Sequence, residues 1–352
     1  MNSIRLKVVS TLGLLVFVIF GASAEVPKDV AYVSTEEGVA VIDLVTLEVI
    51  KKIDVVGKGA RGLGITADGK YLLTANKGTA DVSVIDTSAS KVIRRIAVGK
   101  NPEFMRIHPG SGQAFVTYEP ASTGGPPSAE KPEKSTTEDT VAPAEVAMIY
   151  INSGIVTKLL IGGKETEGIE FSKDGSQMIV ANEGSDTLGV YDLRSRTLVK
   201  TIDVHSYGQR PRGVKLSPDG RTYVVTMEFS NNLLVLDAGY KVVKTVATEK
   251  SPYGVAFDRA GRRVLVAAAR SNHLQVFDAQ SYAPIAAIPV EGRCWHFTFT
   301  PDDTRILAAC GRSNNLLVID AVTYKILNVI SGLQVPWGVV TYPKAFGSLD
   351  TP

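Results

Sequence analysis

One recurring position along this chain carries the residue types best suited to chemistry. It lies just before a glycine, or the residue that replaces it, and is occupied in turn by Arg61, Glu103, Glu167, Arg212, Tyr253, Trp295 and Trp337. Arginine presents a planar, two-pronged donor set that suits carboxylates and phosphates. Tyrosine and tryptophan present a flat apolar wall with a polar tip. Four charged residues followed by three aromatic ones predict an amphipathic mouth.

Such a mouth suits a planar anion, for which a quinone or a haem-type tetrapyrrole is the expected chemistry, or a protein partner with an aromatic tail. Three alternatives stay open. In the first, arginines and glutamates around a narrow opening neutralise one another as a structural ring of ion pairs, and the aromatics plug it. In the second, one glutamate activates water and one arginine holds the anion of a lactone, as in a hydrolase. In the third, the whole rim is a protein–protein scaffold.

His296 follows Trp295 where most other copies carry glycine, so an imidazole replaces the smallest residue close to the mouth. It is a candidate axial ligand of haem iron or a candidate base, and the alternative is a packed histidine that bonds to the backbone. The two cysteines, Cys294 and Cys310, fall on strands expected to pair. We therefore expect either a cross-strand disulfide, in an oxidising compartment, or two packed thiols.

The remaining polar positions predict structure rather than chemistry. A second set follows strand ends on the same face and is expected to be solvated: Asn76, Lys77, Glu119, Asn182, Glu183, Glu228, Arg270 and Arg312. Another set ends an alternating strand in most copies and is expected to cap hairpin turns rather than bind calcium: Asp43, Asp86, Asp192, Asp237, Asp278 and Asp320. Metal-site spacings and fingerprints of nucleotide-binding or serine-hydrolase sites are absent from the sequence.

Seven copies of one repeat position these residues. The copies span 31–70, 71–112, 113–175, 176–220, 221–261, 262–303 and 304–343. Each copy has a β-rich run, an alternating strand that ends on an acid in most copies, a third strand, a Pro/Gly element and a fourth short strand. Four strands at a period of about forty residues are typical of a β-propeller blade. We predict an all-β, seven-bladed propeller that forms a single domain over residues 25–352.

The ends of the repeat array predict how the ring closes. The first copy lacks its innermost strand, and the last copy ends with one spare strand, Trp337–Tyr342. This C-terminal strand is expected to complete the first blade, which leaves no unpaired sheet edge at the junction. Residues 120–143 interrupt the third copy with Pro, Gly, Ser, Thr and charged residues, a composition that predicts a disordered insertion.

Composition and the first residues bear on the location of the protein. Arg5 and Lys7 precede a short apolar run, and Ala22-Ser23-Ala24 matches a signal-peptidase site. Residues 1–24 are therefore expected to be a cleaved signal peptide, with a periplasmic or secreted product and no stable membrane insertion. Of 38 basic and 36 acidic residues, two basic ones lie in this segment. The mature chain would be formally neutral, which argues against nonspecific binding of nucleic acid.

The repeats resemble those of YVTN-type β-propeller proteins, including the WD40/YVTN-like group. The resemblance rests on Tyr32-Val33-Ser34, Leu73-Thr74-Ala75-Asn76 and the Pro-x-Gly elements at Pro211, Pro252 and Pro336. It covers nearly the whole mature chain. The Cys294-Trp295-His296 region is similar to that of secreted, quinoprotein amine dehydrogenase-like propellers found alongside quinoprotein and cytochrome systems. The resemblance implies a binding or accessory protein without established catalysis, and the same fold also hosts lactonases and haem-binding propellers.

Overall fold

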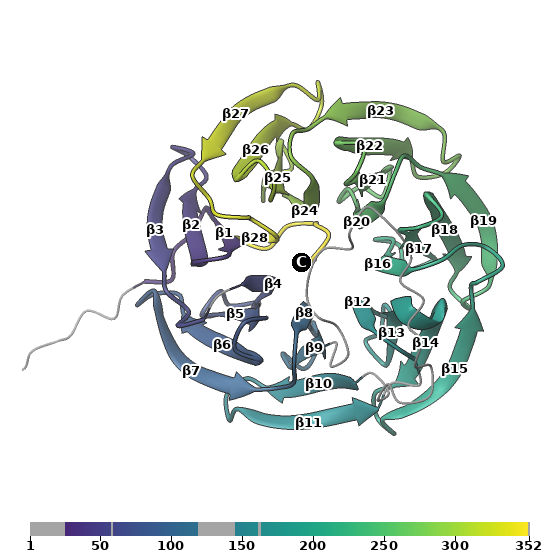
Figure 1. The fold of residues 1–352 in the computed structure, drawn as a ribbon, viewed down its shortest axis with the longest axis horizontal. Coiled ribbons are helices and arrows are strands. Elements are labelled where there is room, and N and C mark those ends of the chain that lie inside the picture. The colour runs from purple at the N-terminus through teal and green to yellow at the C-terminus, as the bar shows by residue number, and fades with distance from the viewer. Residues whose placement is uncertain (1–24, 58, 119–144, 161–162, 351–352) are drawn as a thin grey trace, which may run out of the picture.

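In a computed structural model of the chain, the described residues are 25–57, 59–118, 145–160 and 163–350. The predicted signal peptide and the predicted insertion at 120–143 lie outside them. The described residues form seven four-stranded antiparallel sheets arranged in a ring (Figure 1). The prediction of an all-β, seven-bladed propeller is confirmed. We number the blades 1 to 7 in the order of their second strands.

Each blade contributes four strands, counted from the ring axis outward. The inner strands, for blades 1 to 7, are β28 (Val339–Tyr342), β4 (Ala60–Ile65), β8 (Pro102–Ile107), β12 (Thr166–Phe171), β16 (Pro211–Leu216), β20 (Pro252–Phe257) and β24 (Cys294–Phe299). The second strands are β1 (Val30–Thr35), β5 (Tyr71–Asn76), β9 (Ala114–Tyr118), β13 (Gln177–Asn182), β17 (Thr222–Met227), β21 (Arg263–Ala268) and β25 (Arg305–Cys310).

The third strands are β2 (Gly38–Asp43), β6 (Asp81–Asp86), β10 (Glu145–Tyr150), β14 (Thr187–Asp192), β18 (Asn232–Asp237), β22 (His273–Asp278) and β26 (Asn315–Asp320). The outer strands are β3 (Val49–Ile53), β7 (Lys91–Ala97), β11 (Ile155–Leu160), β15 (Thr197–Asp203), β19 (Val242–Ala247), β23 (Pro284–Pro289) and β27 (Ile326–Ser331). A single short 3-10 turn, η1 (Glu183–Ser185), is the one helical element in the described part of the chain.

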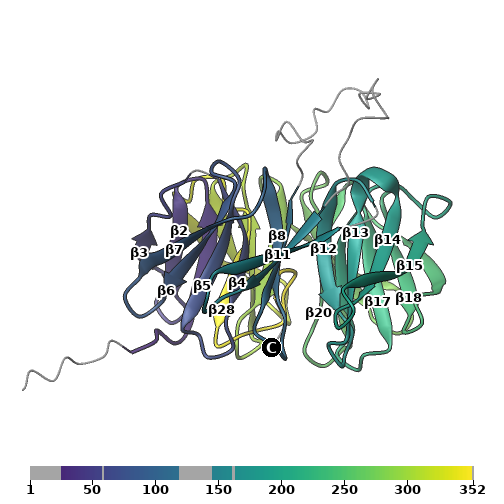
Figure 2. The same cartoon turned by 90° about the horizontal axis from the view of Figure 1, so that it is seen from below.

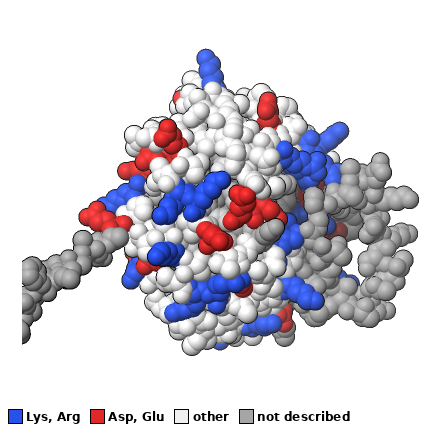
Figure 3. Space-filling view, turned by 60° about the vertical axis from the view of Figure 1, so that its left-hand side comes forward, with Lys and Arg blue, Asp and Glu red and all other residues white. Residues whose placement is uncertain are grey.

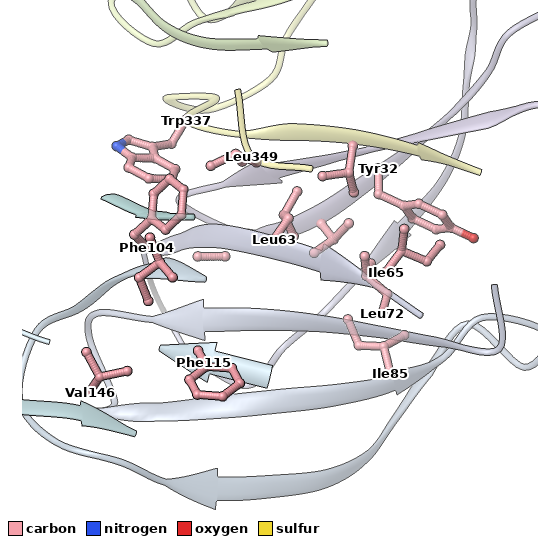
Figure 4. Close-up of a cluster of buried hydrophobic side chains, with 14 of the residues drawn as sticks. Tyr32, Leu63, Ile65, Leu72, Ile85, Phe104, Phe115, Val146, Trp337 and Leu349 are labelled. Atoms are coloured by element: carbon pink, nitrogen blue, oxygen red, sulfur yellow. The ribbon is translucent and has the colours of Figure 1, made fainter. Parts of the chain in front are cut away.

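Burial follows the position of each strand in its blade. The second strand β5 is buried on both faces after its first residue, whereas the outer strand β7 alternates exposed residues with partly or fully buried ones. Both faces of the middle strands are covered because neighbouring blades pack on them, so these strands are almost continuously apolar. Figure 4 shows one such inter-blade core, in which Trp337 and Leu349 lie near Phe104 and Leu63.

The ring closes as the strand count predicts. β28 pairs antiparallel with β1, with Tyr32 opposite Val340, and so supplies the inner strand that blade 1 would otherwise lack. The chain then continues along residues 343–350 toward the ring axis, at the face opposite the mouth (Figures 1 and 2). We refer to residues 343–350 as the C-terminal tail.

The aspartates that end the third strands cap hairpin turns, as predicted. The Oδ1 atom of Asp43 accepts hydrogen bonds from the backbone N–H groups of Val45 and Thr46, at 2.8 and 2.7 Å. Asp192 and Asp320 accept equivalent bonds two or three residues ahead. These bonds to the charged form are the main reason that the pKa of Asp43 lies below its ordinary value.

Candidate functional site

The local backbone explains why one position per blade points at the ring axis. Each inner strand is preceded by a residue with left-handed φ, at Gly59, Asn101, Glu165, Arg210, Ser251, Arg293 and Val335. In blades 2 to 7 the pairing of the inner strand with its neighbour then shifts register over its first four residues. Such an irregularity re-aims the side chain it contains. The structure therefore brings the seven predicted mouth residues to one end of the axis.

The next position is glycine in five copies because adjacent inner strands approach closely there. A Cβ atom built at Gly62 would lie 2.6 Å from the carbonyl oxygen of Glu103, and one at Gly213 would lie 2.6 Å from that of Tyr253. A larger residue cannot fit at such distances without a shift of the backbone. Phe104 and His296 replace glycine in blades 3 and 7, and their rings lie 6.2 Å apart.

Arg212 is the centre of a buried ionic network, which we call the mouth network. Its guanidinium group lies 2.7 Å from Glu183, 2.8 Å from Glu228 and 3.2 Å from Glu167. Arg210 adds ion pairs to Glu183 and Glu228 at 2.8 and 3.1 Å. The side chain of Arg212 is only 6% exposed. Arg212 is therefore occupied by carboxylates of its own chain, whereas the sequence predicted a donor set open to a ligand.

Arg61 and Glu103 form a second pair at the mouth, between blades 2 and 3. Of the two mouth arginines, Arg61 keeps more of its side chain exposed, at 21% against 6% for Arg212. The charged half of the mouth thus matches the alternative in which arginines and glutamates neutralise one another.

Burial raises the pKa values of two glutamates of the mouth network, whereas neighbouring arginines lower the pKa of the third. Burial raises the pKa of Glu183 to about 8, although Arg212 and Arg210 oppose the shift. Burial also raises the pKa of Glu167, against the effect of Arg212. Glu228 is buried too, but its three arginine neighbours outweigh burial and hold its pKa below the ordinary value. Protons in the network are therefore held preferentially at Glu167 and Glu183.

The aromatic half of the mouth is divided between a plug and an accessible ring. Tyr253 and Trp337 are buried, and their rings pack edge-on at 6.4 Å. The hydroxyl of Tyr253 donates to Glu167 at 2.8 Å, which joins the plug to the mouth network. Trp295 is partly exposed and lies over Gly311, where a Cβ atom would collide with its ring. Of the three aromatic residues predicted to form an apolar wall for a ligand, only Trp295 is accessible.

His296 is enclosed by the aromatic plug. Its ring lies 4.2 Å from that of Trp337 and 5.4 Å from that of Tyr253, and its Nδ1 lies 3.0 Å from the hydroxyl of Ser348. Burial, with smaller contributions from Lys215 and Arg212, lowers the pKa of His296 to about 3. His296 is 2% exposed, and its Nε2 has no hydrogen-bond partner among the described residues. A group as large as a haem could reach this nitrogen only if the rings of Tyr253 and Trp337 moved away. Among the residues that the structure describes, no cluster of His, Cys, Asp and Glu is suited to a metal ion.

Cys294 and Cys310 are joined by a disulfide between β24 and β25. The two residues are direct partners in the register of these strands, immediately before the shift at His296. Of the two expectations for this pair, the structure therefore has the disulfide. It ties the start of β24, which carries Trp295, to the end of β25, directly before the loop that begins at Gly311.

The expectation of solvated strand ends is wrong for half of its members. Asn76, Asn182, Glu183 and Glu228 are buried, and the two glutamates belong to the mouth network. Arg270 and Arg312 are exposed, as expected, whereas Lys77 is partly buried and Glu119 lies outside the described residues. The available signal for the buried glutamates was the nearby pair Arg210 and Arg212, because a buried arginine and a partly buried one both need carboxylate partners.

A second layer of charge, absent from the sequence predictions, lies nearer the opposite end of the axis. Arg106 donates two hydrogen bonds to Glu170, at 2.8 and 2.7 Å, and Lys215 lies 3.7 Å from the same carboxylate. All three occupy the fifth position of their inner strands, three residues after a mouth residue. This regular spacing in three successive repeats is the feature of the sequence from which the second layer of charge could have been predicted.

The C-terminal tail covers this second layer. Arg106 donates to the carbonyl of Leu349 at 2.8 Å, and Lys215 donates to that of Asp350 at 3.1 Å. Lys344 forms an ion pair with Asp350 at 2.9 Å. Burial, together with Arg106, lowers the pKa of Lys215 well below its ordinary value. The axis is therefore filled by polar contacts at one end and by the aromatic plug at the other.

Comparisons with known proteins agree with this geometry at the level of fold. A family model described as a YNCE-like beta-propeller matches residues 6–108, and one described as a lactonase, 7-bladed beta-propeller, matches residues 160–239. Each match covers less than half of the chain. No curated protein matches the chain.

Solved structures similar to this chain come from proteins of different kinds. A chain of Kuenenia stuttgartiensis hydrazine synthase is 19% identical, with a TM-score of 0.69, and the match covers 87% of this chain and 99% of that one. A protein of Bacteroides uniformis, provisionally described as a 6-phosphogluconolactonase, is 13% identical, with a TM-score of 0.70, over 89% and 99% of the two chains. The dihydro-heme d1 dehydrogenase NirN is 14% identical, with a TM-score of 0.64, over 89% and 75%. These likenesses show a shared fold.

Proposed function

We propose that this propeller is a binding protein, which captures a partner at its mouth face and does not turn over a substrate in its axis. The observation that carries the proposal is the mouth network. Glu167, Glu183 and Glu228 are at most 4% exposed, and each lies within ion-pair distance of Arg212. A general base must reach its substrate, and an anion-holding arginine must have free donors. Neither requirement is met by these side chains.

The accessible groups of the mouth face lie on its rim instead. Trp295 is partly exposed, and Arg270 and Arg312 are exposed on nearby loops. Aromatic and arginine side chains are the types that contribute most to protein interfaces. Figure 3 shows that acidic and basic side chains are interspersed over one side of the molecule, which gives no broad field of a single sign for nucleic acid. A protein partner fits this rim best.

The proposal extends to location and context. The disulfide supports a site of action outside the cytoplasm, because such bonds persist in oxidising compartments. The described residues include no helix long and apolar enough to cross a membrane. The resemblance to secreted propellers of quinoprotein and cytochrome systems supports a partner in a periplasmic oxidation system.

Two measurements test the proposal. The first is hydrolysis of a panel of sugar lactones and homoserine lactones by the wild type and by Glu167→Gln. We expect no turnover by either protein. Turnover by the wild type that Glu167→Gln abolishes would replace the binding function with a lactonase.

The second measurement is native mass spectrometry of the chain purified from its own host, followed by a denaturing run. We expect a noncovalent complex whose excess mass is that of a protein. An excess below about 1 kDa would favour a small ligand over a protein partner, with the quinone and tetrapyrrole expectations separated by its size. A clean mass for the chain alone would count against stable capture.

A further inference from the structure

Three loops on the mouth face between blades 6 and 7 are joined by hydrogen bonds. They are residues 269–272, between β21 and β22; 290–293, between β23 and β24; and 311–314, between β25 and β26. The amide of Arg293 donates to Oδ1 of Asn272 at 3.1 Å, and that of Arg312 donates to the carbonyl of Gly292 at 2.7 Å. Each loop carries one arginine: Arg270, Arg293 and Arg312. We call these three residues the arginine rim.

The arginine rim has more positive charge than its surroundings neutralise. Arg270 and Arg312 are exposed, and no described residue forms an ion pair or side-chain hydrogen bond with either. Glu291 is the one acidic residue within the three loops. Glu249, on the adjoining loop before β20, is paired with His273 at 2.6 Å. The rim therefore keeps an excess of positive charge on an exposed surface.

Arg293 is buried at the inner side of the rim, yet its own donors are incompletely used. The residue is 5% exposed, and its Nε has no hydrogen-bond partner among the described residues. The nearest carboxylate is that of Glu228, which lies 3.7 Å from a terminal nitrogen and already pairs with Arg210 and Arg212. Burial, together with the charges of Arg312 and Arg270, lowers the pKa of Arg293. A buried donor without a partner is costly and marks a place for an incoming acceptor.

Trp295 gives the rim an apolar floor. The guanidinium carbon of Arg293 lies 5.7 Å from the centre of the Trp295 ring, and the ring rests on Gly311, next to Arg312. The disulfide between Cys294 and Cys310 joins β24, which carries the ring, to β25, which ends directly before Gly311. An accessible aromatic face bordered by arginines on linked loops is a preorganised surface, which reduces the entropy lost on binding.

We propose that the arginine rim and Trp295 form the docking site for an acidic segment of a partner protein. Carboxylates of the segment pair with Arg270 and Arg312 and supply an acceptor to Arg293, while an apolar side chain covers Trp295. The cations are distributed over three loops, so they match a row of carboxylates along a chain better than a single small anion. This inference rests on the proposed binding function and names the chemistry of its partner.

The test uses a synthetic decapeptide of nine glutamates around one central phenylalanine. Its binding to the full chain is measured by calorimetry and by tryptophan fluorescence, at low and physiological salt. The double variant Arg270→Gln/Arg312→Gln changes two exposed side chains and should fold normally. We expect it to bind the peptide about tenfold more weakly, the size expected from the loss of two exposed ion pairs. We also expect higher salt to weaken wild-type binding.

Matched controls separate the rim from general charge. Arg262 is an exposed arginine of the same blade as Arg270, on the turn between β20 and β21 at the opposite face. Arg262→Gln should leave binding unchanged, and Trp295→Phe should remove most of the fluorescence response, because Trp337 is buried. The same peptide with lysines in place of glutamates should not bind.

Three outcomes would overturn the inference: no binding of the acidic peptide to the wild type, equal loss in Arg262→Gln and the rim variant, or displacement of the peptide by low millimolar inorganic phosphate. The last result would identify a general anion site. The lactone assay is run on the same preparations. If the acidic peptide does not bind and no lactone is hydrolysed, the docking site proposed here is wrong but the proposed binding function is not. If the wild type hydrolyses a lactone, the proposed binding function is itself wrong.

Discussion

Arg212 donates a 2.8 Å hydrogen bond from its Nε to Oε2 of Glu228, in a part of the ring where both residues are at most 5% exposed. Arg212 belongs to β16, and Glu228 directly follows β17 of the same blade. A charge pair at this depth gains little over an apolar pair, because desolvation offsets the Coulomb attraction. Removal of one partner is different, since it leaves the other charge buried and uncompensated.

Arg212→Met should therefore lower the free energy of unfolding by about 3–5 kcal/mol. The substitution leaves Glu167, Glu183 and Glu228 without their common cation. The measurement is denaturant unfolding followed by circular dichroism, with Arg221→Met, at an exposed turn of the same blade, as the control. A loss below about 1 kcal/mol, the range of exposed pairs, would show that the network contributes little to stability.

The raised pKa of Glu183 predicts how stability depends on pH. Its folded pKa of about 8 exceeds the ordinary value of 4.5, so the folded state binds this proton more tightly than the unfolded state. The resulting stabilisation is fully present below pH 4.5 and is lost as the pH rises through 8. Glu183→Gln mimics the protonated carboxyl group and should be more stable than the wild type at pH 8 but not at pH 4.5.

The difference between Glu183→Gln and the wild type is the informative quantity, because other groups titrate in the same interval. The pKa of Glu167 is also raised, and that of His205 is raised by its hydrogen bond to Asp186. Unfolding midpoints of both proteins, measured from pH 4.5 to 8.5, give this difference directly. Parallel curves over the whole interval would mean that Glu183 is not protonated preferentially in the folded state.

Reduction of the disulfide should destabilise the protein. Cys294 and Cys310 are 16 residues apart, and closing a loop of this size stabilises a fold by ~3 kcal/mol in the chain-entropy model. We expect dithiothreitol to lower the denaturant midpoint of the wild type and to have no effect on Cys294→Ala/Cys310→Ala. An equal response of both proteins to the reductant would assign the effect to something other than this bond.

His296 should remain neutral in the folded protein between pH 5 and 8. Its pKa of about 3 follows from burial and from the nearby Lys215 and Arg212. In a histidine-selective proton–nitrogen spectrum from pH 5 to 8, the His296 ring signals should not move, whereas those of the exposed His205 should titrate. Titration of His296 in this range would show that water or a ligand reaches the aromatic plug.

Leu349 should anchor the C-terminal tail. It is 1% exposed and packs in the same core as Trp337 and Phe104. Leu349→Ala should cost about 2–5 kcal/mol, as expected for a large-to-small change in a core. Val322→Ala is the control, because Val322 is 78% exposed on a turn. A cost no larger than that of Val322→Ala would mean that the tail is not needed to close the core.

The sequence predicted the ring because its signals are repeated and periodic. Strand spacing gave the seven blades, and the spare strand after Trp337 gave the closure through β28. The register of the mouth residues was also correct, since one backbone geometry recurs before every inner strand. Because the repeat occurs seven times, each of these predictions rested on several independent occurrences of the same pattern.

The chemistry of the site was less predictable, because it depends on partners outside the repeat pattern. Glu183 follows β13 at a turn where a side chain can face either solvent or the axis. Its ion pair with Arg210 holds it in the buried orientation. The C-terminal tail has no periodicity, so its contacts to Arg106 and Lys215 had no signal in the sequence. Burial of Arg212 by three carboxylates could not be read from a single recurring position.

The closure of blade 1 sets an order of events for a growing chain. Ser34 of β1 meets Gly338, which directly precedes β28, by a hydrogen bond between residues 304 positions apart. Synthesis runs from the N-terminus toward the C-terminus, so strands β1 to β3 are made before the other described strands, and β28 completes their sheet last. Until then the inner edge of β1 is unpaired, and an unpaired edge invites association with other chains. Blade 1 is thus the first blade of the ring to be started and the last to be completed, and its open edge needs protection from other chains for the longest time.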